Sequence, residues 1–321
     1  MNKVFSDLKL FTCNAHPELA NEIAELMGIK VGKSTVNKFS DGEIQVSIWE
    51  SVRDCDVYVV QPTCAPVNDH LMELLIMIDA LKRASAGRIN AVIPYYGYAR
   101  QDRKAKARDP ITAKLVANLI QAAGADRVIS MDLHANQIQG YFDIPVDHLL
   151  GLPILTKYFK EKNLDNVVVV SPDHGSVTRA RNMAERLDAP IAIVDKRRPE
   201  PNKSEIMNII GDIDGKNCIL LDDMIDTAGT LCASVVKLKE MGAGDIYVCA
   251  THGVFSGPAI ERLNNAPIEE CVVTDAIPCA AANQEGSKIK TITIANEIAE
   301  AIYAVYTDRP VSDIFGGDFN L

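Results

Sequence analysis

The 321-residue sequence lacks the features that define several large classes of protein. No apolar run approaches the roughly 18 residues that a membrane span needs. Residues 1–11 show no basic start followed by an apolar core, so no signal peptide is indicated. The net charge of −10 argues against a general nucleic-acid-binding protein, whose surface is normally basic. We therefore expect a soluble, cytoplasmic protein with no nucleic-acid or membrane partner.

Paired cysteines are also missing. The eight cysteines include no Cys-x-x-Cys pair, and several lie within apolar runs such as residues 217–220. This distribution is typical of buried, reduced thiols in a cytosolic protein, and it gives little support to a zinc site or a disulfide framework. The 47% hydrophobic and 24% charged residues are ordinary globular values, in a chain long enough for two domains.

Short β-branched runs alternate with longer amphipathic segments along the whole chain. Strands that are apolar on both faces and separated by helices indicate parallel α/β sheets. A break near residues 149–153 divides the chain into two halves of similar design, and residues 33–49 differ by reading as a β-hairpin. The predicted strands are 56–61, 88–94, 127–132, 167–171, 190–195, 217–221, 245–251 and 270–275, and the predicted helices are 17–27, 68–86, 112–123, 153–160, 176–187, 229–241, 258–264 and 294–306.

The segment from Asp222 to Thr230 is the strongest candidate for a ligand site. It joins an apolar strand to a helical pattern, so unpaired N–H groups and the positive end of a helix dipole favour a phosphate there. Ala228 and Gly229 let a phosphate approach the backbone, while the two carboxylates at the start of the segment can hold sugar hydroxyls or a metal. A simple helix cap explains one Asp or one Thr, but not three Asp and two Thr in nine residues.

Two further strand ends carry polar residues that suit magnesium. His134 follows the predicted strand 127–132, and Asp173 follows the strand 167–171. Carboxyl ends of parallel strands gather ligands at one edge of a sheet. Mg²⁺ uses few protein groups and takes its remaining ligands from substrate phosphates. A lone His after a strand is also a common structural hydrogen-bonding residue, so this pairing is only moderately specific.

Positive charge gathers in two short stretches, 100–108 and 196–203, each of which follows a predicted strand. On an acidic protein such stretches favour a small local anion over a long polyanion. The first suits a nucleotide polyphosphate, and the second suits cations that close over a phosphoryl group in transfer. Exposed, solvated loops are the alternative for both stretches.

The Asp222 to Thr230 segment resembles the type I phosphoribosyltransferase signature, in which an apolar strand and two acidic residues precede Asp-Thr-x-x-Thr. Over essentially the whole chain, the ordered motifs resemble the phosphate-activated class of the ribose-phosphate pyrophosphokinase family. The further motifs are Phe39-Ser40-Asp41-Gly42-Glu43, Glu50-Ser51-Val52-Arg53, Tyr98-Ala99-Arg100-Gln101-Asp102, Asp132-Leu133-His134, Gln137-Ile138-Gln139-Gly140, Ser171-Pro172-Asp173 and Asp195-Lys196-Arg197-Arg198.

This resemblance implies an enzyme with two tandem phosphoribosyltransferase-like domains, each a mainly parallel sheet flanked by helices. The domains would be 1–150 and 151–305, with 306–321 packing back on the first. The implied reaction is Mg²⁺-dependent transfer of pyrophosphate from ATP to ribose 5-phosphate for nucleotide biosynthesis, in a homo-oligomer that is usually a hexamer, with phosphate as activator and ADP as inhibitor. The implied residues are Phe39, Asp41, Gly42, Glu43, Arg100 and Gln101 for ATP (the first four from a neighbouring subunit); His134 and Asp173 for the metal; Lys196 and Arg198 for catalysis; and Arg198, Asp222, Asp223, Asp226, Thr227, Ala228, Gly229 and Thr230 for ribose 5-phosphate.

The sequence departs from the family pattern at Ser176, where Ser-Pro-Asp-x-Gly-Gly is usual. If that position needs a positive φ, a serine adds a steric cost. Two alternatives remain. A phosphoribosyltransferase would share the Asp222 to Thr230 segment but would not need the hairpin or the Arg100 loop. A catalytically silent regulatory homologue would be expected to carry damaged catalytic positions.

Overall fold

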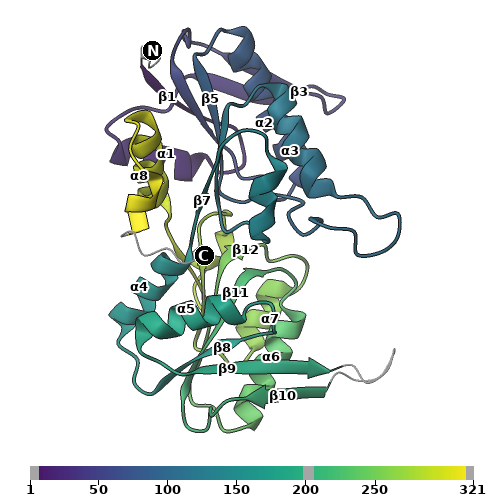
Figure 1. Cartoon of the computed structure of the whole chain (residues 1–321), viewed down its shortest axis with the longest axis vertical. Coiled ribbons are helices and arrows are strands. Elements are labelled where there is room, and N and C mark those ends of the chain that lie inside the picture. Colours follow the sequence, from purple (N-terminus) through teal and green to yellow (C-terminus); the bar gives the residue numbers. More distant parts are fainter. Residues whose placement is uncertain (1–6, 198–205, 316–321) are drawn as a thin grey trace. The chain divides into compact units, whose positions relative to one another are not determined.

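The computed structural model describes residues 7–197 and 206–315. The chain divides into two compact units, each with its own sheet (Figure 1). The first comprises Met1–Leu150, Ala276–Pro278 and Thr293–Leu321, and the second comprises Gly151–Asp275 and Cys279–Ile292. None of the helices within the described residues has the length and apolar character to cross a membrane.

The first unit is built on a five-stranded, fully parallel sheet with the order β1-β4-β5-β6-β7. Its central strands are buried because helices cover both faces, with α2 and α3 on one side and α1 and α8 on the other (Figure 1). The strands are β1 (Leu8–Thr12), β4 (Asp56–Val60), β5 (Arg88–Ile93), β6 (Arg127–Met131) and β7 (Val146–Leu149), and the helices are α1 (Pro17–Leu26), α2 (Val67–Arg83), α3 (Thr112–Ala123) and α8 (Ala295–Tyr306).

Helix α8 joins the first unit although it lies late in the sequence. Its buried face, which includes Ile298 and Ile302, packs against α1. The compact unit therefore takes in the chain from Thr293 onward, whereas the sequence assigned only 306–321 to it. Two short 3-10 helices complete this unit, η1 (Asn136–Tyr141) and η3 (Val311–Phe315).

A two-stranded hairpin of β2 (Ser34–Lys38) and β3 (Ile44–Ile48) also belongs to the first unit. Val36, Val46 and Ile48 pack against the core at its base. The turn is closed by two hydrogen bonds, from Phe39 N to Glu43 O (2.8 Å) and from Gly42 N to Phe39 O (2.9 Å). Gly42 has a φ of 95°, which only glycine adopts without strain, so the turn needs a glycine there.

The second unit is a seven-stranded sheet with the order β10-β9-β8-β11-β12-β13-β14. All neighbouring strands are parallel except β9 and β10, because the connection between them is too short for a parallel crossover. Helices α4 and α5 pack on one face of the sheet, and α6 and α7 on the other. The elements are α4 (Leu152–Lys162), β8 (Val167–Ser171), α5 (Val177–Leu187), β9 (Ile191–Arg197), β10 (Ile206–Ile210), β11 (Asn217–Ile225), α6 (Gly229–Glu240), β12 (Ile246–Gly253), α7 (Ala259–Asn265), β13 (Glu270–Thr274), η2 (Ala280–Asn283) and β14 (Ile289–Ile292).

The prediction of parallel α/β sheets flanked by helices is confirmed, and each predicted strand and helix is present, most of them with shifted ends. The sequence missed four strands, and all four are sheet edges: β1, β7, β10 and β14. Edge strands are short and only half covered, so they lack the continuous apolar run that marks a central parallel strand. One end matters for the site, since β11 continues through Asp222 and Asp223 to Ile225, where we expected a loop after Leu221.

Candidate active site

Acidic residues of the second unit meet just beyond the end of β8, beside the last residues of β11. β8 pairs with β11 in parallel, so the segment after Ser171 and the end of β11 lie at one edge of the sheet. Ser171 Oγ donates to the carbonyl of Asp173 at 2.7 Å and shapes the first of these segments. Asp222 stays within the β-ladder, opposite Ala250 of β12. The ladder therefore fixes the backbone that carries this carboxylate.

Ser176 links the two segments. Its backbone N–H donates to Asp173 Oδ1 at 2.9 Å, and its hydroxyl donates to Asp222 Oδ1 at 3.1 Å. The residue has φ −91° and ψ 3°, a conformation open to any amino acid, so the serine is not strained there. The steric cost that a positive φ would impose does not arise, and the departure from the family pattern instead adds a hydrogen bond.

The Asp222 carboxyl group has an unusual titration. Burial raises its pKa to about 7, and the neighbouring charges of Asp223 and Asp173 act in the same direction. The same carboxyl accepts a hydrogen bond from Asp223 N at 2.9 Å. Clustered carboxylates of this kind repel one another until a cation or hydroxyl donors approach. The arrangement is therefore suited to a metal–phosphate complex or to a sugar with adjacent hydroxyls.

The predicted phosphate segment leads from β11 into α6. Ala228 occupies the N-cap position of that helix in the left-handed conformation, with a φ of 57°. A non-glycine residue there costs roughly 1–2 kcal/mol. This unfavourable conformation occurs at a turn where Thr227 and Thr230 are exposed. The helix start thus presents hydroxyl donors and N–H groups, as an anion site requires.

His174 was not among the predicted site residues, but in the structure it lies at the same sheet edge as Asp173. Its Nε2 lies 3.1 Å from Asp195 Oδ1 near the end of β9. The signal in the sequence was its position directly after the Ser171-Pro172-Asp173 motif. The backbone of the following Lys196 pairs with Met207 of β10, while the Lys196 side chain and all of Arg198 lie outside the described residues.

In the first unit, the predicted ATP residues occupy two places. Phe39, Asp41, Gly42 and Glu43 are exposed at the tip of the hairpin. Arg100 and Gln101 follow β5 and are exposed, with Gln101 fixed by hydrogen bonds from its N–H to Tyr98 O (3.0 Å) and from Ala113 N to its carbonyl (3.2 Å).

His134 follows β6, which is the sheet neighbour of β5, so it shares a sheet edge with the Arg100 loop. The partner in the predicted metal pair, Asp173, belongs to the second unit. Within residues 7–197 and 206–315 no group of three or more His, Cys, Asp or Glu side chains is arranged to hold a metal by itself.

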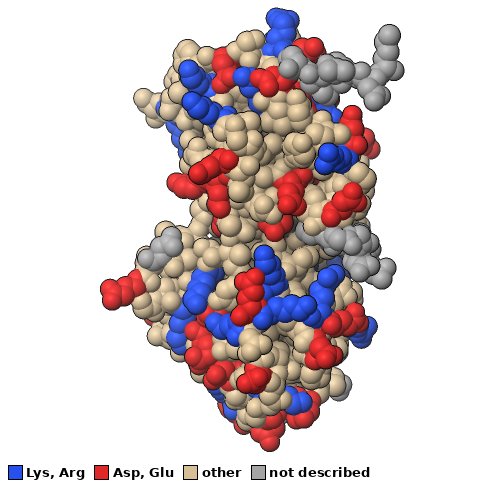
Figure 2. Space-filling view, turned by 90° about the vertical axis from the view of Figure 1, so that its left-hand side faces the viewer, with Lys and Arg blue, Asp and Glu red and all other residues tan. Residues whose placement is uncertain are grey.

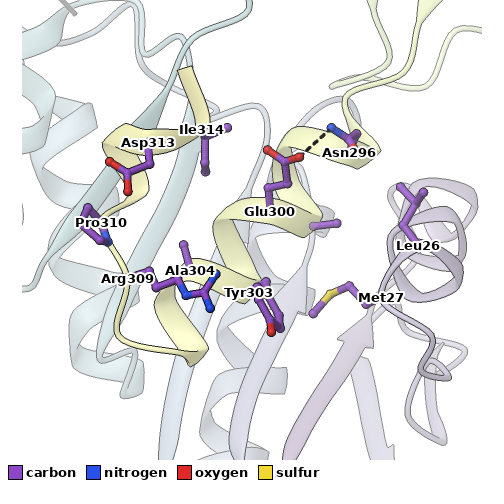
Figure 3. Close-up of a pocket in the computed structure, with 11 residues that line it drawn as sticks. Leu26, Met27, Asn296, Glu300, Tyr303, Ala304, Arg309, Pro310, Asp313 and Ile314 are labelled. Atoms are coloured by element: carbon purple, nitrogen blue, oxygen red, sulfur yellow. Dashed lines mark hydrogen bonds between the residues drawn. The ribbon is translucent and has the colours of Figure 1, made fainter. Parts of the chain in front are cut away.

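The first unit also has a pocket of about 490 Å³ that contains none of the predicted site residues (Figure 3). It lies between the end of α1, helix α8 and η3, and its lining includes Leu26, Met27 and Ile314. Glu300 is turned toward Asn296, from which it accepts a hydrogen bond at 3.3 Å. The mostly apolar lining makes this pocket unsuitable for a polyphosphate.

On the face drawn in Figure 2, Lys and Arg side chains are interspersed with Asp and Glu. That face carries no broad basic surface of the kind that nucleic-acid binding needs.

The parallel sheets and the acidic strand end before the phosphate segment define an α/β protein of the phosphoribosyltransferase-like class with two such units. Residues 8–124 match the family model described as the N-terminal domain of ribose phosphate pyrophosphokinase, and residues 195–316 match the phosphoribosyl synthetase-associated domain. The chain belongs to the ribose-phosphate pyrophosphokinase family.

Named relatives agree with this assignment. A ribose-phosphate pyrophosphokinase of Clostridium perfringens is 66% identical, covering 96% of this chain and 98% of that protein. The protein of the same name from Bacillus subtilis is 59% identical, covering 96% and 97%. The crystal structure of phosphoribosylpyrophosphate synthetase from Mycobacterium smegmatis superposes with a TM-score of 0.89 at 46% identity, covering 94% of this chain and all of that one. These findings favour the predicted enzyme over the transferase and the silent homologue.

Proposed function

We propose that this protein transfers the pyrophosphoryl group of ATP to the anomeric hydroxyl of ribose 5-phosphate, giving 5-phosphoribosyl 1-pyrophosphate and AMP for nucleotide biosynthesis. The observation that carries the proposal is the acidic strand end at Asp222, next to a helix start with the left-handed Ala228. Family membership supports the direction of the chemistry, because relatives with matching length bear the name of this enzyme.

The ribose 5-phosphate site is assigned to the end of β11 and the start of α6. The carboxylates of Asp222 and Asp223 accept hydrogen bonds from the ribose hydroxyls, and the segment from Asp226 to Thr230 holds the 5-phosphate. Ser176 supports this role because its bond to Asp222 Oδ1 limits the rotation of that carboxylate. Holding the sugar in one orientation converts binding free energy into alignment of the attacking oxygen.

ATP is assigned to Arg100 and Gln101 of one subunit and to the hairpin tip of a neighbouring one, Phe39 to Glu43. Phe39 is 51% exposed, which suits stacking on an adenine that a second subunit presents. We further propose that the protein is a homo-oligomer, namely a hexamer. We also assign it to the phosphate-activated class, with phosphate as activator and ADP as inhibitor.

The metal is assigned to His134 and Asp173 as Mg²⁺, which would neutralise polyphosphate charge when bound. The residues fit this ion, because Mg²⁺ needs only one or two protein carboxylates beside waters and substrate phosphates, and the mutually repelling carboxylates of Asp173, Asp222 and Asp223 favour a nearby cation. Lys196 and Arg198 are assigned the catalytic role of stabilising the negative charge that develops during pyrophosphoryl transfer. Arg198 is also assigned to the ribose 5-phosphate site. Transfer of this kind depends on alignment and charge neutralisation, so no protein nucleophile is needed.

A cytoplasmic location fits the thiol chemistry, because the eight cysteines, all within the described residues, form no disulfide and most are buried. The test of the function is to incubate the purified protein with ATP, Mg²⁺ and ribose 5-phosphate and to follow AMP. Sugar-dependent AMP release with stoichiometric 5-phosphoribosyl 1-pyrophosphate is expected. AMP release that does not depend on the sugar, or none at all, would reject the proposal.

A further inference from the structure

Three consecutive carbonyl groups before α6 are held by one neighbouring segment, residues 254–262. The carbonyl of Ile225 accepts from the N–H groups of Val254 and Phe255, each at 3.0 Å, and the carbonyl of Asp226 accepts from Ser256 N at 3.0 Å. The carbonyl of Thr227 accepts from a side chain, Arg262 Nη1 of α7, at 2.8 Å. All three carbonyls therefore turn toward the same side of the phosphate segment.

The orientation of these carbonyls fixes the orientation of the next N–H groups. In a planar trans peptide the C=O and the N–H point in opposite directions. Holding the carbonyls of Ile225, Asp226 and Thr227 against residues 254–262 turns the following three N–H groups to the other side. A concave row of N–H groups is an anion site, provided that no carbonyl faces the same space.

Arg262 controls the last of these peptides, the one between Thr227 and Ala228. Ala228 has the left-handed backbone conformation, which is unfavourable for a residue other than glycine, so this peptide needs outside contacts to hold it. Arg262 also approaches Gly229 closely, because a Cβ on that glycine would lie 3.3 Å from Nη1. A guanidinium on the outer side of the turn thus holds the carbonyl and leaves the inner side to the phosphate.

We propose that Arg262 is a positioning residue for ribose 5-phosphate binding: by holding the Thr227 carbonyl, it keeps the Ala228 N–H turned toward the 5-phosphate. This inference rests on the proposed function. Arg262 acts through the peptide and is not a catalytic residue. Its effect falls on the sugar substrate and leaves the ATP site unchanged.

The test compares Arg262→Met and Arg262→Lys with the wild type, at varied ribose 5-phosphate and saturating Mg–ATP, and then with the substrates reversed. Arg262→Met should raise the KM for ribose 5-phosphate about 5- to 30-fold, since an exposed charge-assisted hydrogen bond is lost. The KM for ATP should stay near its wild-type value. Arg262→Lys keeps a cationic donor and should recover part of the loss.

The matched control is Arg186→Met, which removes an exposed arginine of α5 away from the phosphate segment. Melting curves with and without ribose 5-phosphate check that each variant is folded, and the stabilisation by the sugar should shrink for Arg262→Met but not for Arg186→Met. If Arg262→Met does not fold, Arg262→Gln takes its place with the same readouts. An unchanged KM for the sugar, or equal rises for both substrates, would overturn the role of Arg262. No sugar-dependent AMP release by the wild type would instead reject the proposed function.

Discussion

The hydroxyl of Ser176 donates a 3.1 Å hydrogen bond to Oδ1 of Asp222, and so joins the start of α5 to the end of β11. The Ser-Pro-Asp-x-Gly-Gly pattern expected from the family resemblance has a glycine at this position, which offers no side-chain donor. The serine keeps the backbone bond from its N–H to Asp173 and adds a second contact. Ser176, which departs from the family pattern in the sequence, therefore connects the Asp173 and Asp222 segments of the site.

Replacing Ser176 should therefore weaken sugar binding. Ser176→Ala and Ser176→Gly both remove the hydroxyl, and a hydrogen bond of this kind contributes about 1 kcal/mol, so the KM for ribose 5-phosphate should rise roughly 3- to 8-fold. Steady-state kinetics provide the measurement. Ser176→Ala is the sharper variant because it leaves backbone flexibility nearly unchanged. Wild-type KM values in both variants would mean that the bond does not matter for catalysis.

Lys196→Ala should separate catalysis from binding. A cation that neutralises charge developing in the transition state contributes to kcat, so we expect a loss of roughly 100- to 1,000-fold, with a much smaller change in ATP affinity. Single-turnover rates and nucleotide titrations measure the two effects. A parallel loss in both would make Lys196 a binding residue.

The hairpin is expected to act on a neighbouring subunit. Phe39→Ala and Asp222→Asn should each be nearly inactive, but a co-expressed mixture should regain activity, because some sites then combine an intact hairpin with an intact sugar site. AMP release by the purified mixed oligomer provides the measurement. Failure to regain activity in oligomers shown to contain both variants would place the hairpin in the same subunit's site.

Chelation should remove activity without unfolding the protein. The described residues contain no cluster of three or more metal ligands, so the metal is not expected to hold the fold together. EDTA should abolish AMP release, while the melting temperature of the substrate-free protein should stay constant. Excess Mg²⁺ should restore the rate. A large drop in melting temperature with EDTA would point to a structural metal instead.

Glu270 provides a pH test of stability. Burial alone would raise its pKa, but hydrogen bonds from Lys162, Lys290 and Tyr158 outweigh burial and hold the pKa below its usual 4.5. The lysine ammonium groups lie 2.8 Å from the carboxylate oxygens. Because the folded-state pKa is depressed, this stabilisation is present above the unfolded pKa and is lost as pH falls through the folded one.

Glu270→Gln should therefore lower the free energy of unfolding by about 2–3 kcal/mol at pH 7, since it leaves two cations without their carboxylate. The difference from wild type should shrink as the pH falls below about 4. Urea unfolding at several pH values measures it. Glu240→Gln is the control, because the exposed Lys237–Glu240 pair should contribute less than about 1 kcal/mol. A pH-independent difference would contradict the electrostatic explanation.

The sequence by itself determined the central strands, the helices and the chemistry of the strand ends. Apolar runs such as Val167–Ser171 reflect burial on both faces, and the residue types and spacing of the Asp222 to Thr230 segment predict a sugar-phosphate ligand. These features are local, so a single stretch of chain carries them.

Only the tertiary structure decided which distant residues meet. The four edge strands follow from neighbours that pair with them, and β11 reaches Ile225 because β12 extends beside it. The contact between Ser176 and Asp222 and the bond from Arg262 to Thr227 join residues far apart in the chain. Hydrogen bonds of this kind leave no periodicity in a sequence, because their partners are chosen by how the sheet and helices pack.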